Sequence, residues 1–175
     1  MLTIIYVDGG SHDNSIAIAK SLPDIQVIGL NLTHPTPGLG RNAGWRKTSA
    51  PFVQFLDSDT LLDPDWLMTG VKAFQPDIAA VMGYRLEMDQ TRSVFNWIAN
   101  LEWNSKPGDT ESFGGDVIVR REILEETEGY DEVLVGGEDP ELSRRIRLKG
   151  WRIRQMDANM TYHDLAMTRI NQYWK

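Results

Sequence analysis

The 175-residue sequence contains no cysteine, which excludes disulfide bonds, thiolate metal sites and cysteine nucleophiles. This leaves the redox compartment open, with a cytoplasmic location as the simpler expectation. Hydrophobic runs of the roughly 18 residues that a membrane span needs are also missing. We therefore expect a soluble globular protein rather than a membrane-spanning one.

Positive charge is in short supply. Lysine and arginine together number 18 against 25 aspartates and glutamates, so the formal net charge is −7. This argues against nucleic acid or an anionic membrane surface as the main partner. A phosphate ligand would need a local cation. The length and the 41% content of hydrophobic residues predict one domain over residues 1–175.

Short runs of β-branched and aromatic residues alternate with helical patterns, which predicts an α/β fold. We expect strands at about residues 2–8, 25–30, 52–57, 78–86, 116–120 and 151–156. We expect helices at about residues 13–22, 41–49, 64–75, 92–104, 121–127 and 140–149. The segments 33–38 and 105–115 are rich in turn-forming residues and are predicted to be loops.

Sequence signals support three helix boundaries. Asp63-Pro64 and Asp139-Pro140 each place a capping carboxylate before a proline, whose missing N–H costs nothing at the first helical position. Gly150 is a natural stop for the last helix.

The helix predicted at 92–104 has an apolar face that predicts core packing. This face consists of Val94, Trp97, Ile98 and Leu101. Trp103 lies off the face, where it can line a substrate cleft or an oligomer contact.

Two aspartates, Asp57 and Asp59, follow an apolar strand one residue apart. Together they can hold a hard divalent cation such as Mg²⁺ or Mn²⁺, with phosphate oxygens and water completing the coordination. The alternative is that they merely cap the turn into the next helix. An EF-hand is excluded, because Leu61 and Leu62 occupy positions where its loop needs an oxygen ligand and a glycine.

Residues 38–44 are rich in glycine, and we expect them to open a helix whose N–H groups receive a phosphate. Arg41 would add a charge-assisted hydrogen bond. Plain tight turns are the alternative. The segment is a poor dinucleotide fingerprint, because its last glycine comes one residue late, so a Rossmann domain is a minor option.

Gly136 and Gly137 precede two acids, Glu138 and Asp139, and let the backbone approach a ligand closely. Either carboxylate can accept a proton from an attacking hydroxyl. Helix capping alone explains Asp139 but not Glu138. His163 follows an expected short final strand and is a candidate metal ligand, although a lone histidine is more often structural.

In chain order these motifs resemble the family 2 glycosyltransferases of GT-A fold. The matching segments are Tyr6 to Ser15, Gly40 to Gly44, Phe55 to Thr60, and Gly136 to Asp139 with Arg144-Arg145. The resemblance spans most of the chain and implies a mixed, mostly parallel sheet flanked by helices.

The resemblance also implies roles for individual residues. Nucleotide binding falls to Asp8, which matches a contact to the base, typically uracil, and to Gly10, Arg41 and Asp57. Asp59 matches the ligand of the metal that bridges the diphosphate, and His163 a further metal ligand. Asp139 matches the catalytic base, with Glu138 as second choice.

The implied function is an inverting, metal-dependent transfer of sugar from a nucleotide-diphosphate sugar, with a UDP-sugar favoured, to a hydroxyl acceptor. The acceptor would be a saccharide or lipid-linked, which is compatible with peripheral association at the inner membrane face and with an oligomer. A divalent cation is also expected on electrostatic grounds, because aspartates otherwise repel a diphosphate.

Two departures from the family pattern keep alternatives open. Gly9 stands where the family has a second aspartate, and the chain begins after the family's first strand, loop and helix. We therefore expect a domain truncated at its N-terminus and possibly at its C-terminus. A catalytically incomplete binding module and a nucleotidyltransferase are the alternative functions.

Overall fold

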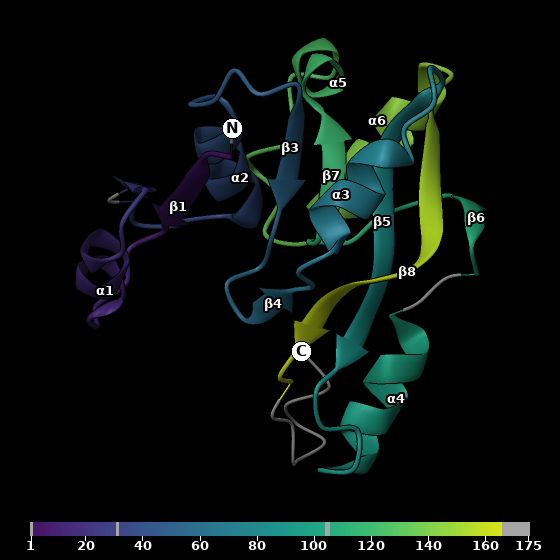
Figure 1. Cartoon of the computed structure of the whole chain (residues 1–175). Helices are drawn as coiled ribbons and strands as arrows, with labels where there is room; N and C mark the ends of the chain where they lie inside the picture. The colour runs from purple at the N-terminus through teal and green to yellow at the C-terminus, as the bar shows by residue number, and fades with distance from the viewer. Residues whose placement is uncertain (1, 31, 104–105, 166–175) are drawn as a thin grey trace.

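The computed structural model describes residues 2–30, 32–103 and 106–165. Two sheets organise it (Figure 1). The smaller has two strands, β1 (Ile4–Asp8) and β2 (Ile25–Gly29), which pair in parallel and are connected by α1 (Ser15–Ser21). The larger runs in the order β3-β7-β5-β8-β4, with β6 also paired to β8.

The bounds of the remaining elements follow from the same structure. The strands of the larger sheet are β3 (Phe52–Phe55), β4 (Thr60–Leu62), β5 (Ile78–Glu87), β6 (Gly108–Thr110), β7 (Val117–Arg120) and β8 (Arg152–His163). The other helices are α2 (Pro37–Trp45), α3 (Trp66–Lys72), α4 (Val94–Glu102), α5 (Arg121–Glu126) and α6 (Glu138–Leu148).

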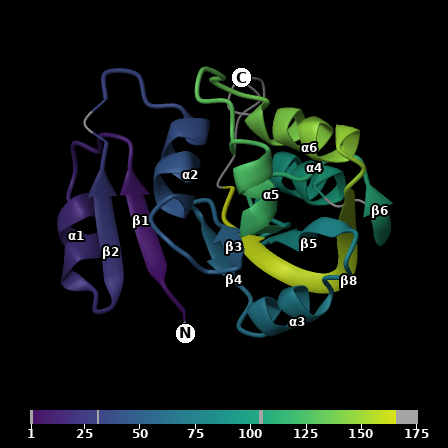
Figure 2. The ribbon, with the colours of Figure 1, turned by 90° about the horizontal axis from the view of Figure 1, so that it is seen from above.

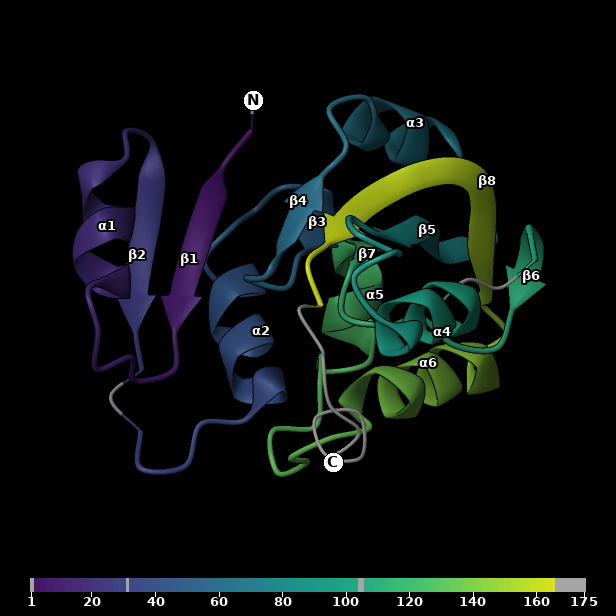
Figure 3. The same ribbon diagram turned by 90° about the horizontal axis from the view of Figure 1, so that it is seen from below.

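Helices cover both faces of the larger sheet. Seen from above and from below, α3 lies on one side while α4, α5 and α6 lie on the other (Figures 2 and 3). Helix α2 stands between the two sheets and contacts β1. None of the described helices is long and apolar enough to cross a membrane.

The mixed α/β fold is confirmed, but the expectation of a mostly parallel sheet is wrong. Of the six pairings among described strands, only β1 with β2 and β5 with β8 are parallel. The other four are antiparallel. That expectation came from the family resemblance, and sequence periodicity could not correct it, because periodicity locates strands without indicating the direction of their neighbours.

The core is centred on β5. Its residues Ile78 to Val81 are fully buried, as expected for a strand covered on both faces. Trp66 of α3 packs tightly on this strand at Gly83, where a Cβ atom would lie 2.6 Å from the indole ring. The same Cβ atom would lie 2.5 Å from the backbone carbonyl oxygen of Ala158 in the sheet, so this close approach requires glycine.

Several predicted boundaries are wrong in informative ways. Helix α2 begins at Pro37, inside the predicted loop 33–38, because Thr36 caps it by accepting a hydrogen bond from the N–H of Leu39. Helix α6 begins at Glu138, so Asp139-Pro140 lies inside its first turn. The stop at Gly150 is confirmed by its φ of 91°.

Strands β4 and β6, each three residues long, were not predicted from the sequence. Strand β8 is continuous over twelve residues, whereas two separate strands were expected there.

The apolar face of α4 does not lie in the core as predicted. Val94, Trp97 and Leu101 are each more than half exposed, and Asn96 and Ala99 are buried instead. Asn96 turns inward because its side-chain amide donates a hydrogen bond to the buried carboxylate of Glu87. The covered face of α4 therefore includes a polar contact with a buried acid of β5.

Candidate active site

Asp8 ends β1 and is almost completely buried. One of its carboxylate oxygens, Oδ1, accepts hydrogen bonds from the N–H groups of Gly10 and Ser11, both at 2.8 Å. Hydrogen bonds from Ser11, followed by that from Gly10, hold the pKa of Asp8 below its usual range. The φ of 123° at Gly10 allows this turn, which leaves an ionised carboxylate at the strand end.

Arg41 lies in the middle of α2 and gathers three acids. Its guanidinium donates to Glu138 Oε1 at 2.5 Å and to Asp57 Oδ1 at 3.0 Å, and it lies 3.5 Å from Asp139 Oδ1. It also stacks over the ring of Tyr130, 5.3 Å from the centroid. Burial opposes its charge, but the surrounding acids outweigh burial and raise the pKa of Arg41.

The glycine-rich segment around Arg41 does not form the expected phosphate loop. Residues 38–44 lie within α2, which begins at Pro37, so Gly38 and Leu39 belong to its first turn and not to a loop ahead of it. A Cβ atom at Gly38 would lie 2.6 Å from the carbonyl oxygen of Asp131, so this glycine serves close packing of α2 against the chain before α6. The loop prediction is therefore wrong at this position.

The two aspartates that follow β3 have different surroundings. The backbone N–H of Asp57 donates to Asp116 at 2.8 Å, whereas the Asp59 side chain is 63% exposed. Arg85 of β5 lies 3.5 Å from Asp57, 4.0 Å from Asp59 and 3.7 Å from Asp116. Arg85 thus ties the pair to a third, buried aspartate.

His163 ends β8, where it pairs with Thr60 of β4 on one side and with Glu87 of β5 on the other. Asp59 directly precedes β4, and this register brings its Oδ2 to 3.0 Å from His163 Nε2. The ring of Trp103 packs edge-on against the imidazole, with centroids 4.9 Å apart. An aspartate and a histidine separated by a hundred residues in sequence therefore lie side by side.

Asp139, in the first turn of α6, is the most strongly perturbed carboxyl group. Burial raises its pKa to about 7, an effect that Arg41 opposes and that Glu138, Asp57 and Asp116 reinforce. Its Oδ1 is buried and accepts no hydrogen bond from the described residues. A carboxyl group with this pKa can exchange a proton near neutral pH.

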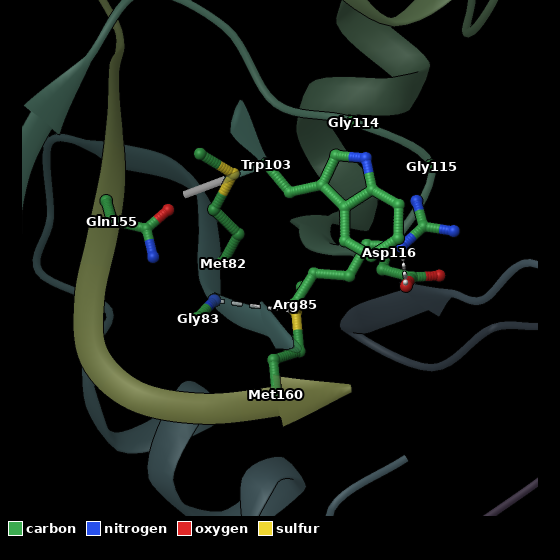
Figure 4. Close-up of a pocket in the computed structure, with 9 residues that line it drawn as sticks. All are labelled: Met82, Gly83, Arg85, Trp103, Gly114, Gly115, Asp116, Gln155 and Met160. Atoms are coloured by element: carbon green, nitrogen blue, oxygen red, sulfur yellow. Dashed lines mark hydrogen bonds and ion pairs between the residues drawn. The ribbon is translucent and has the colours of Figure 1, made fainter. Parts of the chain in front are cut away.

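A pocket lies beside these charges (Figure 4). Trp103, Arg85 and Asp116 gather on one side of it, and the methionines Met82 and Met160 also line it. Gly114, Gly115, Gly83 and Gln155 complete the lining. Trp103 was expected in either a cleft or an oligomer contact, and the structure places it in this pocket.

Gly115 is required by the geometry of the site. A Cβ atom at this position would lie 2.3 Å from Asp57 Oδ2, so only glycine lets the loop approach the carboxylate this closely.

Three residues that sequence reasoning missed belong to this cluster: Arg85, Glu87 and Asp116. Arg85 and Glu87 are charged residues in an otherwise apolar strand, and Asp116 directly precedes the apolar strand β7. A charged residue in such surroundings is the signal that was available, because burial of an unpaired charge is costly. Burial raises the pKa of Asp116, against hydrogen bonds from Asp57 and Thr161.

Few of the side chains in this cluster are placed to coordinate a metal ion. Among residues 2–30, 32–103 and 106–165 no group of three or more histidines, aspartates and glutamates is arranged to hold a metal ion. Asp59 provides one oxygen, Oδ2, and His163 provides one nitrogen, Nε2, and these two atoms lie 3.0 Å from each other. Two such ligands fit a cation whose other positions are filled by phosphate oxygens and water.

The sequence matches a known protein family. The family model described as "Glycosyl transferase family 2" matches residues 2–126, well over half of the chain. The chain belongs to glycosyl transferase family 2.

Curated relatives of this family 2 domain are glycosyltransferases. It is 26% identical to the O-antigen chain rhamnosyltransferase RfbN of Salmonella typhimurium, over 97% of the chain and 59% of the relative. It is 27% identical to a pre-mycofactocin glycosyltransferase of Mycobacterium tuberculosis, over 93% of the chain and 37% of the relative. The chain thus spans between a third and two thirds of the length of these relatives.

Solved structures confirm the GT-A fold of the family 2 domain. S. aureus TarS in complex with UDP-GlcNAc superposes with a TM-score of 0.74 at 17% identity, covering 99% of this chain and 52% of that one. The mannosyltransferase PcManGT of Pyrobaculum calidifontis, in complex with GDP-Man and Mn²⁺, gives 0.74 at 19% identity, covering 98% and 50%.

Proposed function

We propose that this domain transfers a sugar from a nucleotide-diphosphate sugar, with a UDP-sugar favoured, to the hydroxyl of a saccharide or lipid-linked acceptor, with inversion at the anomeric carbon. Family membership supports the reaction class. The observation that supports the mechanism is the buried carboxyl of Asp139, whose Oδ1 accepts no hydrogen bond from the described residues and whose pKa is about 7, beside the acidic cluster of the β3–β4 turn.

Asp139 is the proposed catalytic base. An acceptor hydroxyl must lose its proton as its oxygen attacks the sugar, and a carboxylate with a pKa near the working pH performs this transfer well. Glu138 is the weaker candidate, because its Oε1 already accepts a hydrogen bond from Arg41 at 2.5 Å. In the same proposal Arg41 holds both acids at the start of α6 and positions Asp139.

Asp59 and His163 are the proposed metal ligands. A divalent cation held there would neutralise the charge that grows on the departing nucleoside diphosphate. An oxygen and a nitrogen ligand together suit Mn²⁺ better than Mg²⁺, which prefers oxygen alone. The exposure of Asp59 leaves room for the phosphate oxygens that would complete the coordination.

Asp8, Gly10, Arg41 and Asp57 are the proposed nucleotide-binding residues. Asp8 is ionised at the strand end and can accept hydrogen bonds from a nucleobase. Arg41 and Asp57 are paired with one another, so a diphosphate would have to compete for this guanidinium. Binding of a diphosphate to Arg41 would therefore require its contact with Asp57 to break.

Calorimetric titration with UDP and with GDP, each with and without Mn²⁺, tests the proposal. We expect UDP to bind in the presence of Mn²⁺, and Asp59→Ala to weaken this binding at least tenfold by removing a metal ligand. Asp157→Ala, which changes an exposed aspartate outside the cluster, is the matched control. UDP binding that is indifferent to Mn²⁺ and to Asp59→Ala would contradict the metal assignment.

Donor hydrolysis distinguishes an enzyme from a binding module. A glycosyltransferase site releases free sugar slowly from its donor when water replaces the acceptor, so we expect Mn²⁺-dependent release of UDP from one member of a panel of UDP-sugars. Nucleotide binding without turnover of any donor or acceptor would favour the alternative, a catalytically incomplete module.

A further inference from the structure

Arg85 lies among the aspartates around the β3–β4 turn. Each nitrogen of its guanidinium is near a different carboxylate: Nη1 lies 3.5 Å from Asp57 Oδ2, Nη2 lies 4.0 Å from Asp59 Oδ1, and Nε lies 3.7 Å from Asp116 Oδ2. An arginine side chain remains charged throughout the pH range in which proteins function. A permanent positive charge therefore lies beside the carboxylates that would attract a metal ion.

This charge is held in place from two sides (Figure 4). The guanidinium carbon lies 5.0 Å from the centroid of the Trp103 ring, within the range of a cation–π interaction. Asp116 is almost completely buried and is itself fixed, because it accepts hydrogen bonds at 2.8 Å from the backbone N–H of Asp57 and the hydroxyl of Thr161. The Arg85 side chain is only 21% exposed, so water and salt weaken its interactions less than those of a surface arginine.

The position of Arg85 affects the proposed metal ligand Asp59. A divalent cation coordinated by either oxygen of Asp59 would lie less than about 10 Å from the guanidinium, because metal–oxygen bonds are about 2.1 Å long and Nη2 is 4.0 Å from Oδ1. Like charges repel at such separations, since the screening length is about 10 Å at 0.1 M salt. Arg85 therefore opposes a second positive charge at Asp59.

We propose that Arg85 is the internal counter-cation of these aspartates and weakens the binding of a divalent cation until a diphosphate is present. In the free protein the guanidinium neutralises part of the carboxylate charge that a cation would use. The negative charge of a nucleoside diphosphate offsets the repulsion between guanidinium and cation, so the site accommodates both positive charges. Arg85 thus makes cation and nucleotide bind as a pair. This inference rests on the proposed function, since it needs a cation at Asp59.

The affinity for Mn²⁺ alone tests this role without any turnover. Arg85→Gln removes the charge and keeps a polar side chain of intermediate length. We expect calorimetry to show that this variant binds Mn²⁺ about tenfold more tightly than the unaltered chain, because the repulsion is gone. With saturating UDP the two chains should bind Mn²⁺ within about threefold of each other. The strengthening of Mn²⁺ binding by UDP is therefore smaller in the variant.

Two further variants separate the position of the charge from its shape and from net charge. Arg85→Lys keeps a positive charge at this position, and we expect its affinity for Mn²⁺ alone to stay within about threefold of the unaltered chain. Arg152→Gln changes the net charge by the same amount at the opposite end of β8, where Arg152 pairs with Asp77 and Asp109. This control should also leave Mn²⁺ affinity unchanged.

The outcomes distinguish this inference from the proposed function. Binding of Mn²⁺ alone that is equal or weaker in folded Arg85→Gln, while the unaltered chain binds Mn²⁺ with UDP, would overturn the role of Arg85 and leave the metal site standing. A chain that binds no Mn²⁺ even with UDP would contradict both. If Arg85→Gln does not fold, the unaltered chain decides: UDP must strengthen Mn²⁺ binding at least about tenfold, and Mn²⁺ binding indifferent to UDP would overturn the inference.

Discussion

At the scale of single residues, the proposed catalytic role of Asp139 and its burial favour different protonation states. Proton abstraction needs its ionised form, whereas burial favours the neutral form and raises its pKa to about 7 from an ordinary value of 3.8. The folded chain therefore holds a proton that the unfolded chain releases near pH 4. The stability that this proton contributes is fully present below about pH 4 and is lost as the pH rises through about 7.

Asp139→Asn is expected to abolish transfer and to flatten the pH dependence of stability. Loss of a general base lowers turnover about 10²- to 10⁴-fold, while UDP affinity should stay within about twofold. The variant should gain on the order of 2 kcal/mol over the unaltered chain between pH 5 and pH 8, since one pKa unit corresponds to about 1.4 kcal/mol and partial exposure screens the shift. Urea unfolding at both pH values and a turnover assay provide the measurements.

The pH profile of turnover gives a second view of the same group. We expect the rate to increase about tenfold per unit below pH 7 and to level off above it. Full turnover in Asp139→Asn would show that the base assignment is wrong.

At the scale of elements, α2 shows what a sequence motif can and cannot reveal. The glycines around Arg41 predicted a loop, but they lie inside a helix, where Gly38 permits close packing. The same helix carries Asn42, whose amide donates to the carbonyl of Tyr130 and to Glu132, both at 2.8 Å. The side-chain oxygen of Asn42, Oδ1, accepts hydrogen bonds from the indole N–H of Trp45 and from the backbone N–H of Tyr130.

Asn42→Ala is therefore expected to be strongly destabilising. Removing the amide leaves the buried indole N–H of Trp45 and the N–H and carbonyl of Tyr130 without these partners, which costs about 3 kcal/mol. It should also loosen the segment that leads to α6 and so lower turnover. Chemical denaturation would measure the loss, with Asn159→Ala at an exposed position as the control. A loss below about 0.5 kcal/mol would contradict this role.

Element order and the ends of most elements could be predicted, because apolar periodicity and capping residues are local signals. Strand direction and the short strands β4 and β6 could not, since three-residue strands exist only through pairing with β8. The candidate site likewise contains residues that local sequence patterns identify and residues whose contacts depend on the fold. Asp57, Asp59 and Asp139 lie in local motifs, whereas the partners of Arg85 and Glu87 become visible only when β5 is seen beside β8 and the β3–β4 turn.

At the scale of the whole molecule, the two sheets differ in their support. The larger sheet is covered by helices on both faces and contains the fully buried strand β5 (Figures 2 and 3). In the part of the chain that the structure describes, β1 and β2 pair only with each other, and β1 also contacts α2. Two-stranded sheets are marginally stable unless something packs against them.

Hydrogen exchange should reveal this difference. We expect the amides of β1 and β2 to exchange at least about tenfold faster than those of β5 and β8, because the smaller sheet can open without unfolding the core. If Asp8 contacts the nucleobase, UDP with Mn²⁺ should slow exchange at the end of β1. Equal protection of the two sheets would show that the molecule opens only as a whole.

The cluster around Arg41 and Arg85 has one more consequence. Opposite charges alternate from Asp139 through Arg41, Asp57 and Arg85 to Asp59. Positive charge added at the Asp59 end makes the Asp139 proton easier to lose. By thermodynamic reciprocity, loss of that proton must strengthen cation binding by the same factor. A cation that binds at Asp59 would thus convert Asp139 into an active base at a lower pH, and proton release on titration with Mn²⁺ would report this linkage directly.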